Sequence, residues 1–188
     1  MNSKIIGLTG AFGSGKSTAA AFFKELGFYK IVLSEFLEEE AKKRGTTDIT
    51  RKVLQDIGNE WREKYGASVL AKKALHEILV GKHEKVVIDG IRNIGEIKYL
   101  RNSGNFTLAA VVSDRKTRFE RLRKLKRREN LTWELFEKLD ARDSGVGERG
   151  TGLQVDRCIE LANITIKNNR NEEDFKNKLK QVLDKYGK

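Results

Sequence analysis

The sequence predicts an α/β fold in which a parallel sheet is covered by helices on both faces. Apolar runs of strand length alternate along the chain with segments whose apolar residues recur at helical spacing. A glycine-rich motif joins the first apolar run to the first such segment. A length of 188 residues suits one domain with a sizeable core. Because no internal repeat or linker divides the chain, we expect residues 1–188 to form a single domain.

The glycine-rich motif, residues 10–17, has the spacing G-x-x-x-x-G-K-[ST]. The apolar run 5–8 before it predicts a buried strand, and the Ala- and Phe-rich segment 18–26 after it predicts a helix. Glycines let backbone N–H groups approach phosphate oxygens closely, because no Cβ stands in the way. The glycines concerned are Gly10, Gly13 and Gly15. The expected ligand is therefore a nucleoside triphosphate, with ATP as the expected cofactor.

Two side chains of the motif complete this chemistry. Lys16 is expected to reach the β- and γ-phosphates, and the hydroxyl of Ser17 is expected to bind Mg²⁺. The helix that begins near Lys16 directs its unpaired N–H groups and its positive dipole end at the same anion. The other residues assigned to the nucleotide site are Phe12, Ser14, Thr18 and Asn168.

The elements between residues 29 and 89 are predicted from the spacing of apolar residues and from residues typical of helix ends. Residues 29–33 predict a second strand, after which Ser34 is expected to cap a helix over residues 34–44 that ends at Gly45. Apolar residues at helical spacing predict helices over residues 49–65 and 69–79, separated by Gly66. We expect the whole segment 34–81 to be a helical insertion that binds the acceptor. The apolar run 85–89 then predicts a central strand.

The second half of the chain continues the alternation of helices and strands. Residues 94–102, 115–128, 132–142, 155–161 and 172–186 predict helices, and residues 106–112 and 164–167 predict strands. The glycine-rich segment 144–152 is expected to be mobile. Residues 115–152 together are expected to form a lid over the nucleotide.

Two charged residues follow the predicted strand 85–89. An acidic residue at the carboxyl tip of a strand beside a phosphate loop is the usual holder of Mg²⁺ or its bound water, which makes Asp89 the second metal candidate. An Asp that forms a turn with Gly90 is the alternative. Arg92 falls where ligands of open α/β sheets bind, and a guanidinium there suits phosphate recognition. A surface arginine is the alternative for Arg92.

Basic residues crowd the predicted helix 115–128. Phosphoryl transfer spreads negative charge over the moving group, and arginines carried by a closing segment stabilise that charge. Only one or two of these bases can reach a phosphate, and the others are expected to lie on a solvated helix face. The arginines assigned to catalysis, together with Lys16, Asp89 and Arg92, are Arg121, Arg127 and Arg142.

Composition narrows the functional classes. The net charge of +11 suits a polyanionic ligand, either nucleic acid or a nucleotide. No segment approaches the roughly 18 apolar residues that a membrane span requires, and the N-terminus lacks a signal-peptide pattern. The single cysteine, Cys158, cannot form an internal disulfide, which favours a buried structural thiol in a reducing compartment. We expect a cytoplasmic monomer or homodimer without a membrane partner.

Several stretches resemble known kinases. The loop 7–18 looks much like that of dephospho-CoA kinases, and the ending 162–169 is similar too. The segment 86–92 resembles the Asp-Gly-x-Pro-Arg segment of adenylate kinases, without its proline and with Arg92 one residue early. The stretches 33–44, 49–74 and 118–143 look closer to adenylate-kinase-related proteins and to kinase-like segments associated with deoxycytidylate deaminases. Together these stretches resemble the nucleoside-monophosphate-kinase branch of P-loop proteins.

This resemblance implies a three-layer α/β/α sandwich with a five-stranded parallel sheet, a helical acceptor-binding insertion and an arginine-bearing lid. It also implies transfer from ATP·Mg²⁺ to a nucleoside or deoxynucleoside monophosphate. Dephospho-CoA kinases carry Asp-x-Asp after strand two, whereas Leu33-Ser34-Glu35 stands here, so only Glu35 can replace their proposed base. The lid lacks a four-cysteine zinc pattern. The residues assigned to the acceptor are Glu35, Arg44, Arg51, Arg62 and Arg92.

Two other functions stay open at this point. Dephospho-CoA is the nearest alternative acceptor, and a nucleic-acid-associated P-loop ATPase is the alternative from another class. The chain has no recognisable nucleic-acid-binding module, and outside residues 115–128 its basic residues are interspersed with acidic ones. We therefore favour the small-molecule kinase.

Overall fold

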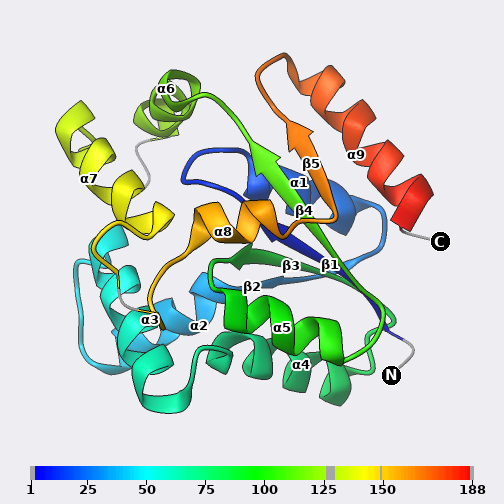
Figure 1. Cartoon of the computed structure of the whole chain (residues 1–188), viewed down its shortest axis with the longest axis horizontal. Coiled ribbons are helices and arrows are strands. Elements are labelled where there is room, and N and C mark those ends of the chain that lie inside the picture. The colour runs from blue at the N-terminus through cyan, green and yellow to red at the C-terminus, as the bar shows by residue number, and fades with distance from the viewer. Residues whose placement is uncertain (1–2, 126–129, 149, 187–188) are drawn as a thin grey trace.

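The computed structural model describes residues 3–125, 130–148 and 150–186, and its core is a five-stranded sheet with helices on both faces (Figure 1). The strand order is β2-β3-β1-β4-β5, and every neighbouring pair is parallel. This arrangement confirms the predicted fold class. The strands are β1 (Lys4–Thr9), β2 (Tyr29–Val32), β3 (Lys85–Ile91), β4 (Phe106–Val112) and β5 (Ile164–Lys167).

Helices surround the sheet on both faces. Those of the first half of the chain are α1 (Lys16–Glu25), α2 (Leu33–Lys43), α3 (Arg51–Tyr65), α4 (Val69–Gly81) and α5 (Ile94–Asn102). Those of the second half are α6 (Arg115–Leu125), α7 (Trp133–Ser144), α8 (Val155–Glu160) and α9 (Glu172–Tyr186).

Alternation along the strands divides the core between the two faces. In β1, Ile5 joins one apolar cluster, whereas Ile6 and Leu8 join the other, as a period of two residues requires. Helices α1 and α9 cover the second cluster, and the helices of the insertion, α5 and α8 cover the first. Each face of the sheet is therefore buried, which is why the strands read as continuous apolar runs.

The segment predicted to form a lid, residues 115–152, contains a small apolar cluster of its own. Leu131, Phe136 and Leu139 are buried, and the phosphate-loop residue Phe12 packs against them. The rings of Phe12 and Phe136 lie stacked with their centroids 6.2 Å apart. The lid helices α6 and α7 lie beyond the arrowhead of β4 in Figure 1, at the sheet edge where the phosphate loop emerges. The lid therefore packs directly on the loop through an aromatic contact.

Several predicted boundaries differ from the structure, two of them beside the phosphate loop. The predicted Ser34 cap is wrong: α2 begins at Leu33, and its N-cap residue is Val32, without a side-chain hydrogen bond. Strand β2 ends at Val32 and α2 begins at the next residue, so no loop separates them. Leu33, the first residue of the helix, is buried in the core. Strand β3 runs past its predicted end at Asp89 to Ile91, because Ile91 pairs with Thr9 across a bulge. This extension brings Arg92 to the sheet edge beside the phosphate loop.

The single cysteine, Cys158, is a buried residue of α8, and burial raises the pKa of its thiol to about 12. Such a thiol stays protonated at neutral pH and is a poor nucleophile. Within the described ranges, no helix has the length and apolar character needed to cross a membrane.

Candidate active site

The phosphate loop joins β1 to α1 at the carboxyl edge of the sheet. Its glycines Gly10, Gly13 and Gly15 have φ angles of +142°, +81° and +106°, in the left-handed region that favours glycine. A Cβ on Gly10 would lie 2.1 Å from the carbonyl oxygen of Val111. A Cβ on Gly15 would lie 2.3 Å from Nδ2 of Asn168. The loop therefore needs glycine both for its conformation and for its contacts with the ends of β4 and β5.

A substitution at Gly10 tests this packing. We expect Gly10→Ala to lower the free energy of unfolding by at least about 2 kcal/mol, because the positive φ and the overlap with a backbone oxygen both oppose a side chain. Gly27 also has a positive φ, but a Cβ there would meet nothing within 4 Å, which makes Gly27→Ala the matched control. Urea unfolding measures both changes, and equal losses in the two variants would contradict the packing argument.

Lys16, at the first position of α1, is buried with 7% of its surface exposed. Its Nζ donates hydrogen bonds to the carbonyl oxygens of Gly10 at 2.7 Å and Ala11 at 3.0 Å. Burial, assisted by the nearby positive charge of Arg92, lowers the pKa of Lys16 to about 7. A triphosphate in the loop would supply the missing anionic partner and raise this pKa again.

The shifted pKa predicts a proton uptake. Without nucleotide, Lys16 loses its proton as pH rises through about 7, whereas nucleotide phosphates favour the charged form. Nucleotide binding should therefore take up about one proton between pH 8 and 9, and the affinity should fall as pH rises above 7. Calorimetric titration in buffers of different ionisation enthalpy measures the uptake, with Lys16→Met as control. Equal uptake by that variant would assign the proton to another group.

The two predicted metal residues lie side by side. The Ser17 hydroxyl donates a hydrogen bond of 2.9 Å to Oδ2 of Asp89, near the end of β3. A hydroxyl and a carboxylate are ligand types that Mg²⁺ accepts, and Mg²⁺ usually keeps several waters and few protein ligands. Across the described residues, no group of three or more His, Cys, Asp or Glu side chains offers a richer metal site. Ser17 and Asp89 therefore fit a Mg²⁺ ion that also binds phosphates.

A cavity of about 560 Å³ opens over the loop, between the end of β3, helices α2 and α3, and the lid. A volume of that size suits a nucleotide-sized ligand. Most of the residues that the sequence assigned to the site line it. They are Phe12, Gly13, Gly15, Lys16, Ser17, Thr18, Glu35, Arg51, Arg62, Asp89, Arg92 and Arg121.

A carboxylate that was not predicted joins three elements beside this cavity. Oδ2 of Asp143, in α7, accepts hydrogen bonds from Arg51 of α3 and, at 2.6 Å, from Nη1 of Arg92. Its Oδ1 accepts one of 2.7 Å from Nε2 of Gln55. Burial alone would raise the pKa of Asp143, but the two guanidinium groups outweigh burial and hold the pKa below its usual range. Asp143 thus ties the lid to the insertion and to β3 as a buried anion.

A second buried pair holds the lid to the phosphate loop. Arg118 in α6 makes two hydrogen bonds with Asp140 in α7, of 2.5 and 2.8 Å. The same guanidinium donates to the carbonyl oxygen of Phe12 at 2.9 Å. Arg118, one of the basic residues of α6, therefore has a structural role: it joins α6 to α7 and to the phosphate loop.

Among the described residues of the lid, Arg121 is the arginine that lines the cavity. It donates to the backbone oxygen of Asn168 at 3.0 Å, and Nδ2 of Asn168 donates to the backbone oxygen of Ser14 at 2.9 Å. Arg121 and Asn168 thereby connect the lid, the end of β5 and the phosphate loop. Arg121 lines the cavity, Asn168 does not, and the assignment of both to the phosphates stays a prediction.

Two predicted arginines, Arg44 and Arg142, lie outside the cavity. The structure contradicts the assignment of Arg44, whose exposed guanidinium binds Glu40 and Glu60 outside the cavity. It also contradicts that of Arg142, which binds Asp56 and Glu148 and does not line the cavity. Arg127 falls outside the residues that the structure describes.

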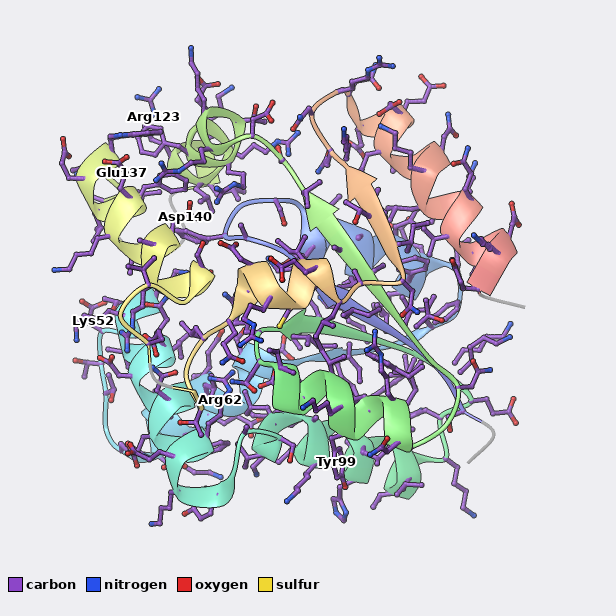
Figure 2. The ribbon with its side chains drawn as sticks, in the orientation of Figure 1. Lys52, Arg62, Tyr99, Arg123, Glu137 and Asp140 are labelled. Carbon is purple, nitrogen blue, oxygen red and sulfur yellow. The ribbon has the colours of Figure 1, made fainter. Side chains whose placement is uncertain are left out.

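Arg62 lies deep between α3 and α5 (Figure 2). Only 1% of its surface is exposed, and its Nε and Nη2 both donate to Oε1 of Glu96, at 3.0 and 2.9 Å. The other carboxylate oxygen of Glu96, Oε2, accepts hydrogen bonds from the backbone N–H groups of Arg92 and Asn93. Glu96 therefore anchors Arg62 and fixes the chain at the end of β3.

Comparison with known proteins identifies relatives over nearly the whole chain. Residues 6–143 match the family described as AAA domain. A UPF0200/UPF0201 protein of Archaeoglobus fulgidus is 35% identical over 98% of this chain, and the match covers 56% of the relative. A UPF0200 protein of Sulfurisphaera tokodaii is 35% identical over 96% of each chain. The chain thus spans about half of the first relative and almost all of the second.

Solved structures with the same fold include P-loop kinases. Shikimate kinase from Bacteroides thetaiotaomicron superposes with a TM-score of 0.57 at 17% identity, covering 98% of this chain and 99% of that one. Dephospho-CoA kinase from Campylobacter jejuni superposes with a TM-score of 0.50 at 16% identity, covering 99% of this chain and 98% of that one. Likeness at such low identity establishes the fold and leaves the acceptor to be argued from the site.

Proposed function

The chain belongs to the UPF0200 family and has a P-loop kinase fold, and from this premise we propose that it is an ATP-dependent nucleotide kinase. In this proposal the γ-phosphoryl group of ATP passes to a nucleoside or deoxynucleoside monophosphate. The triphosphate occupies the loop around Lys16, and the acceptor occupies the part of the cavity lined by the insertion.

The observation that carries the proposal is an excess of positive charge beside the triphosphate loop. Arg51 and Arg92 both line the cavity and both bind the carboxylate of Asp143. The described residues that line the cavity include more basic than acidic side chains, and guanidinium groups bind phosphate through paired N–H donors. A second phosphate group, in addition to those at Lys16, complements this charge.

The protein residues act mainly by positioning and by electrostatic stabilisation. Arg51 and Arg92 orient the acceptor phosphate, one oxygen of which forms a bond to the γ-phosphorus while the bond to the β–γ bridging oxygen breaks. Lys16 and the loop N–H groups hold the charge of the transferred group and of the departing ADP. A bound Mg²⁺ would neutralise charge on the β- and γ-phosphates. A phosphate acceptor needs no general base at neutral pH, so the absence of an Asp at position 35 is no obstacle.

An acceptor panel tests the proposal. ADP formation from ATP and Mg²⁺ is measured with each ribo- and deoxyribonucleoside monophosphate, with dephospho-CoA, with shikimate and without acceptor. We expect at least one monophosphate to raise the rate at least about tenfold above the no-acceptor rate. A rate raised only by dephospho-CoA or shikimate would assign another acceptor. A rate unaffected by every compound would refute the nucleotide-kinase proposal.

A further inference from the structure

Asn168 follows the last residue of β5 and contacts the phosphate loop from outside the cavity. The residue is buried, with 6% of its surface exposed, and it does not line the cavity. Its backbone N–H donates to the carbonyl oxygen of Val112 at 2.8 Å, which continues the pairing of β4 with β5 by one residue. Asn168 therefore has a fixed position between the sheet and the loop.

The side chain of Asn168 binds one peptide group of the loop. Its Nδ2 donates a hydrogen bond of 2.9 Å to the carbonyl oxygen of Ser14. In a trans peptide the C=O of one residue and the N–H of the next point in opposite directions, and none of the described peptide bonds is cis. The N–H of Gly15 therefore points away from Asn168.

This N–H is available to a ligand. Gly15 lines the cavity, and its N–H donates to no protein acceptor among the residues that the structure describes. Backbone N–H groups that a loop and a helix N-terminus leave unpaired are the donors that bind phosphate oxygens. The Ser14–Gly15 peptide thus separates its two polar groups, with the carbonyl bound by Asn168 and the N–H left for an anion.

Glycine at position 15 makes the orientation of this peptide depend on Asn168. The φ angle of Gly15 is +106°, and glycine adopts positive and negative φ about equally well. Residue 15 therefore adds little steric preference for one orientation of the Ser14–Gly15 peptide. In the flipped peptide the Ser14 carbonyl would take the place of the N–H and would repel a phosphate. The hydrogen bond from Asn168 holds the carbonyl on the other side.

The other contacts of Asn168 do not need this amide nitrogen. Its backbone oxygen accepts from Nη1 of Arg121 at 3.0 Å, whereas its Oδ1 lies 3.4 Å from Nη2 of the same guanidinium. The backbone pairing with Val112 is likewise independent of the side chain. Asn168→Ala therefore removes the bond to the loop and retains the shorter contact with the lid arginine.

We infer that Asn168 is a positioning residue, which holds the Ser14–Gly15 peptide so that the Gly15 N–H binds a phosphate of the nucleotide. The inference rests on the proposed function, in which the triphosphate occupies this loop. Asn168 then acts on the triphosphate through the loop, and not by the direct contact with nucleotide that the sequence predicted.

Calorimetric titration of the intact protein with Mg²⁺ and two ligands tests the inference. The ligands are a non-hydrolysable ATP analogue and inorganic triphosphate, which carries the phosphates without a nucleoside. We expect Asn168→Ala to weaken both by a similar factor of about ten, because each ligand loses a correctly oriented donor. Asn169→Ala is the matched control and should bind both ligands like the wild type, since Oδ1 of Asn169 accepts from the exposed backbone N–H of Asp114.

Nuclear magnetic resonance of ¹⁵N-labelled protein follows the Gly15 N–H itself. Inorganic triphosphate should move the Gly15 amide proton of the wild type downfield, as a hydrogen bond to an anionic oxygen does. The same change should be smaller in Asn168→Ala, whereas the responses of the Lys16 and Ser17 amides should be retained. A general loss of structure would instead alter all three amides.

Each contrary outcome has a distinct meaning. If Asn168→Ala weakens the ATP analogue alone, Asn168 contacts the nucleoside and the inference is wrong. If the variant is less stable in urea but binds both ligands like the wild type, Asn168 has a structural role only and the inference is wrong. If the wild type binds neither ligand, the proposed function fails together with the inference. Should Asn168→Ala not fold, a Gly15 amide that does not respond to triphosphate in the wild type would overturn the inference.

Discussion

Replacing Lys16 by methionine is expected to lower the rate of ADP formation by about 10²–10³-fold. The Lys16 ammonium is the cationic side chain that the phosphate loop itself contributes, and the wall of the cavity already holds it in a buried position. Methionine has a similar length and volume, so the loop should retain its shape while losing the charge that stabilises the transferred phosphoryl group.

Lys24→Met provides the matched control for this prediction. Lys24 lies in the last turn of the same helix, α1, and is exposed at its surface. Steady-state kinetics at saturating ATP and circular dichroism should show an intact fold in both variants and lost turnover in the Lys16 variant alone. Turnover by Lys16→Met within about tenfold of the wild-type rate would exclude the loop as the site of transfer.

Replacing Asp143 by alanine is expected to lower the free energy of unfolding by about 3–5 kcal/mol. The carboxylate is fully buried, and its removal leaves the guanidinium groups of Arg51 and Arg92 close together without their shared anion. It also removes the partner of the Gln55 amide. The links that α7 makes through this carboxylate to α3 and to the end of β3 are lost with it.

Asp56→Ala is the matched control, because the carboxylate of Asp56 also binds two cations, Lys52 and Arg142, but is 44% exposed. Its loss should cost at most about 1 kcal/mol. Urea unfolding in chloride buffer measures both variants. Sulfate should then stabilise Asp143→Ala more than the wild type, because it can replace the missing anion between the two arginines. Equal destabilisation of the two variants would contradict the claim that Asp143 stabilises the fold as a buried anion paired with two arginines.

Local sequence signals were sufficient for the sheet and the phosphate loop. Each central strand is a short apolar run because both faces of the sheet are buried, and the loop motif requires glycines at positions where the backbone has positive φ. Ser17 and Asp89, each predicted to bind Mg²⁺, one from the motif and one from the strand end, lie within hydrogen-bond distance of each other. The end of β3 was placed too early because Gly90 indicates a turn locally, whereas pairing of Ile91 with Thr9 extends the strand.

The arginines were harder to place because their roles depend on distant carboxylates. Arg44 meets Glu60 of α3, and Arg142 meets Asp56 of α3, contacts that no local pattern specifies. The sequence does contain a pattern that could have identified Asp143. With Phe136 and Leu139 it recurs at helical spacing, so it lies on the apolar face of α7. A charged residue on the apolar face of a helix is a candidate for a buried ion pair.

The most direct test of phosphoryl transfer follows the label of γ-³²P-ATP in the presence of the nucleoside monophosphate that most increases ADP formation. Separation of the products by thin-layer chromatography shows where the label goes. The kinase proposal predicts label in the corresponding nucleoside diphosphate, in an amount equal to the ADP formed. Label recovered only as inorganic phosphate, at the same rate with and without the acceptor, would show that the protein hydrolyses ATP and would contradict the proposal.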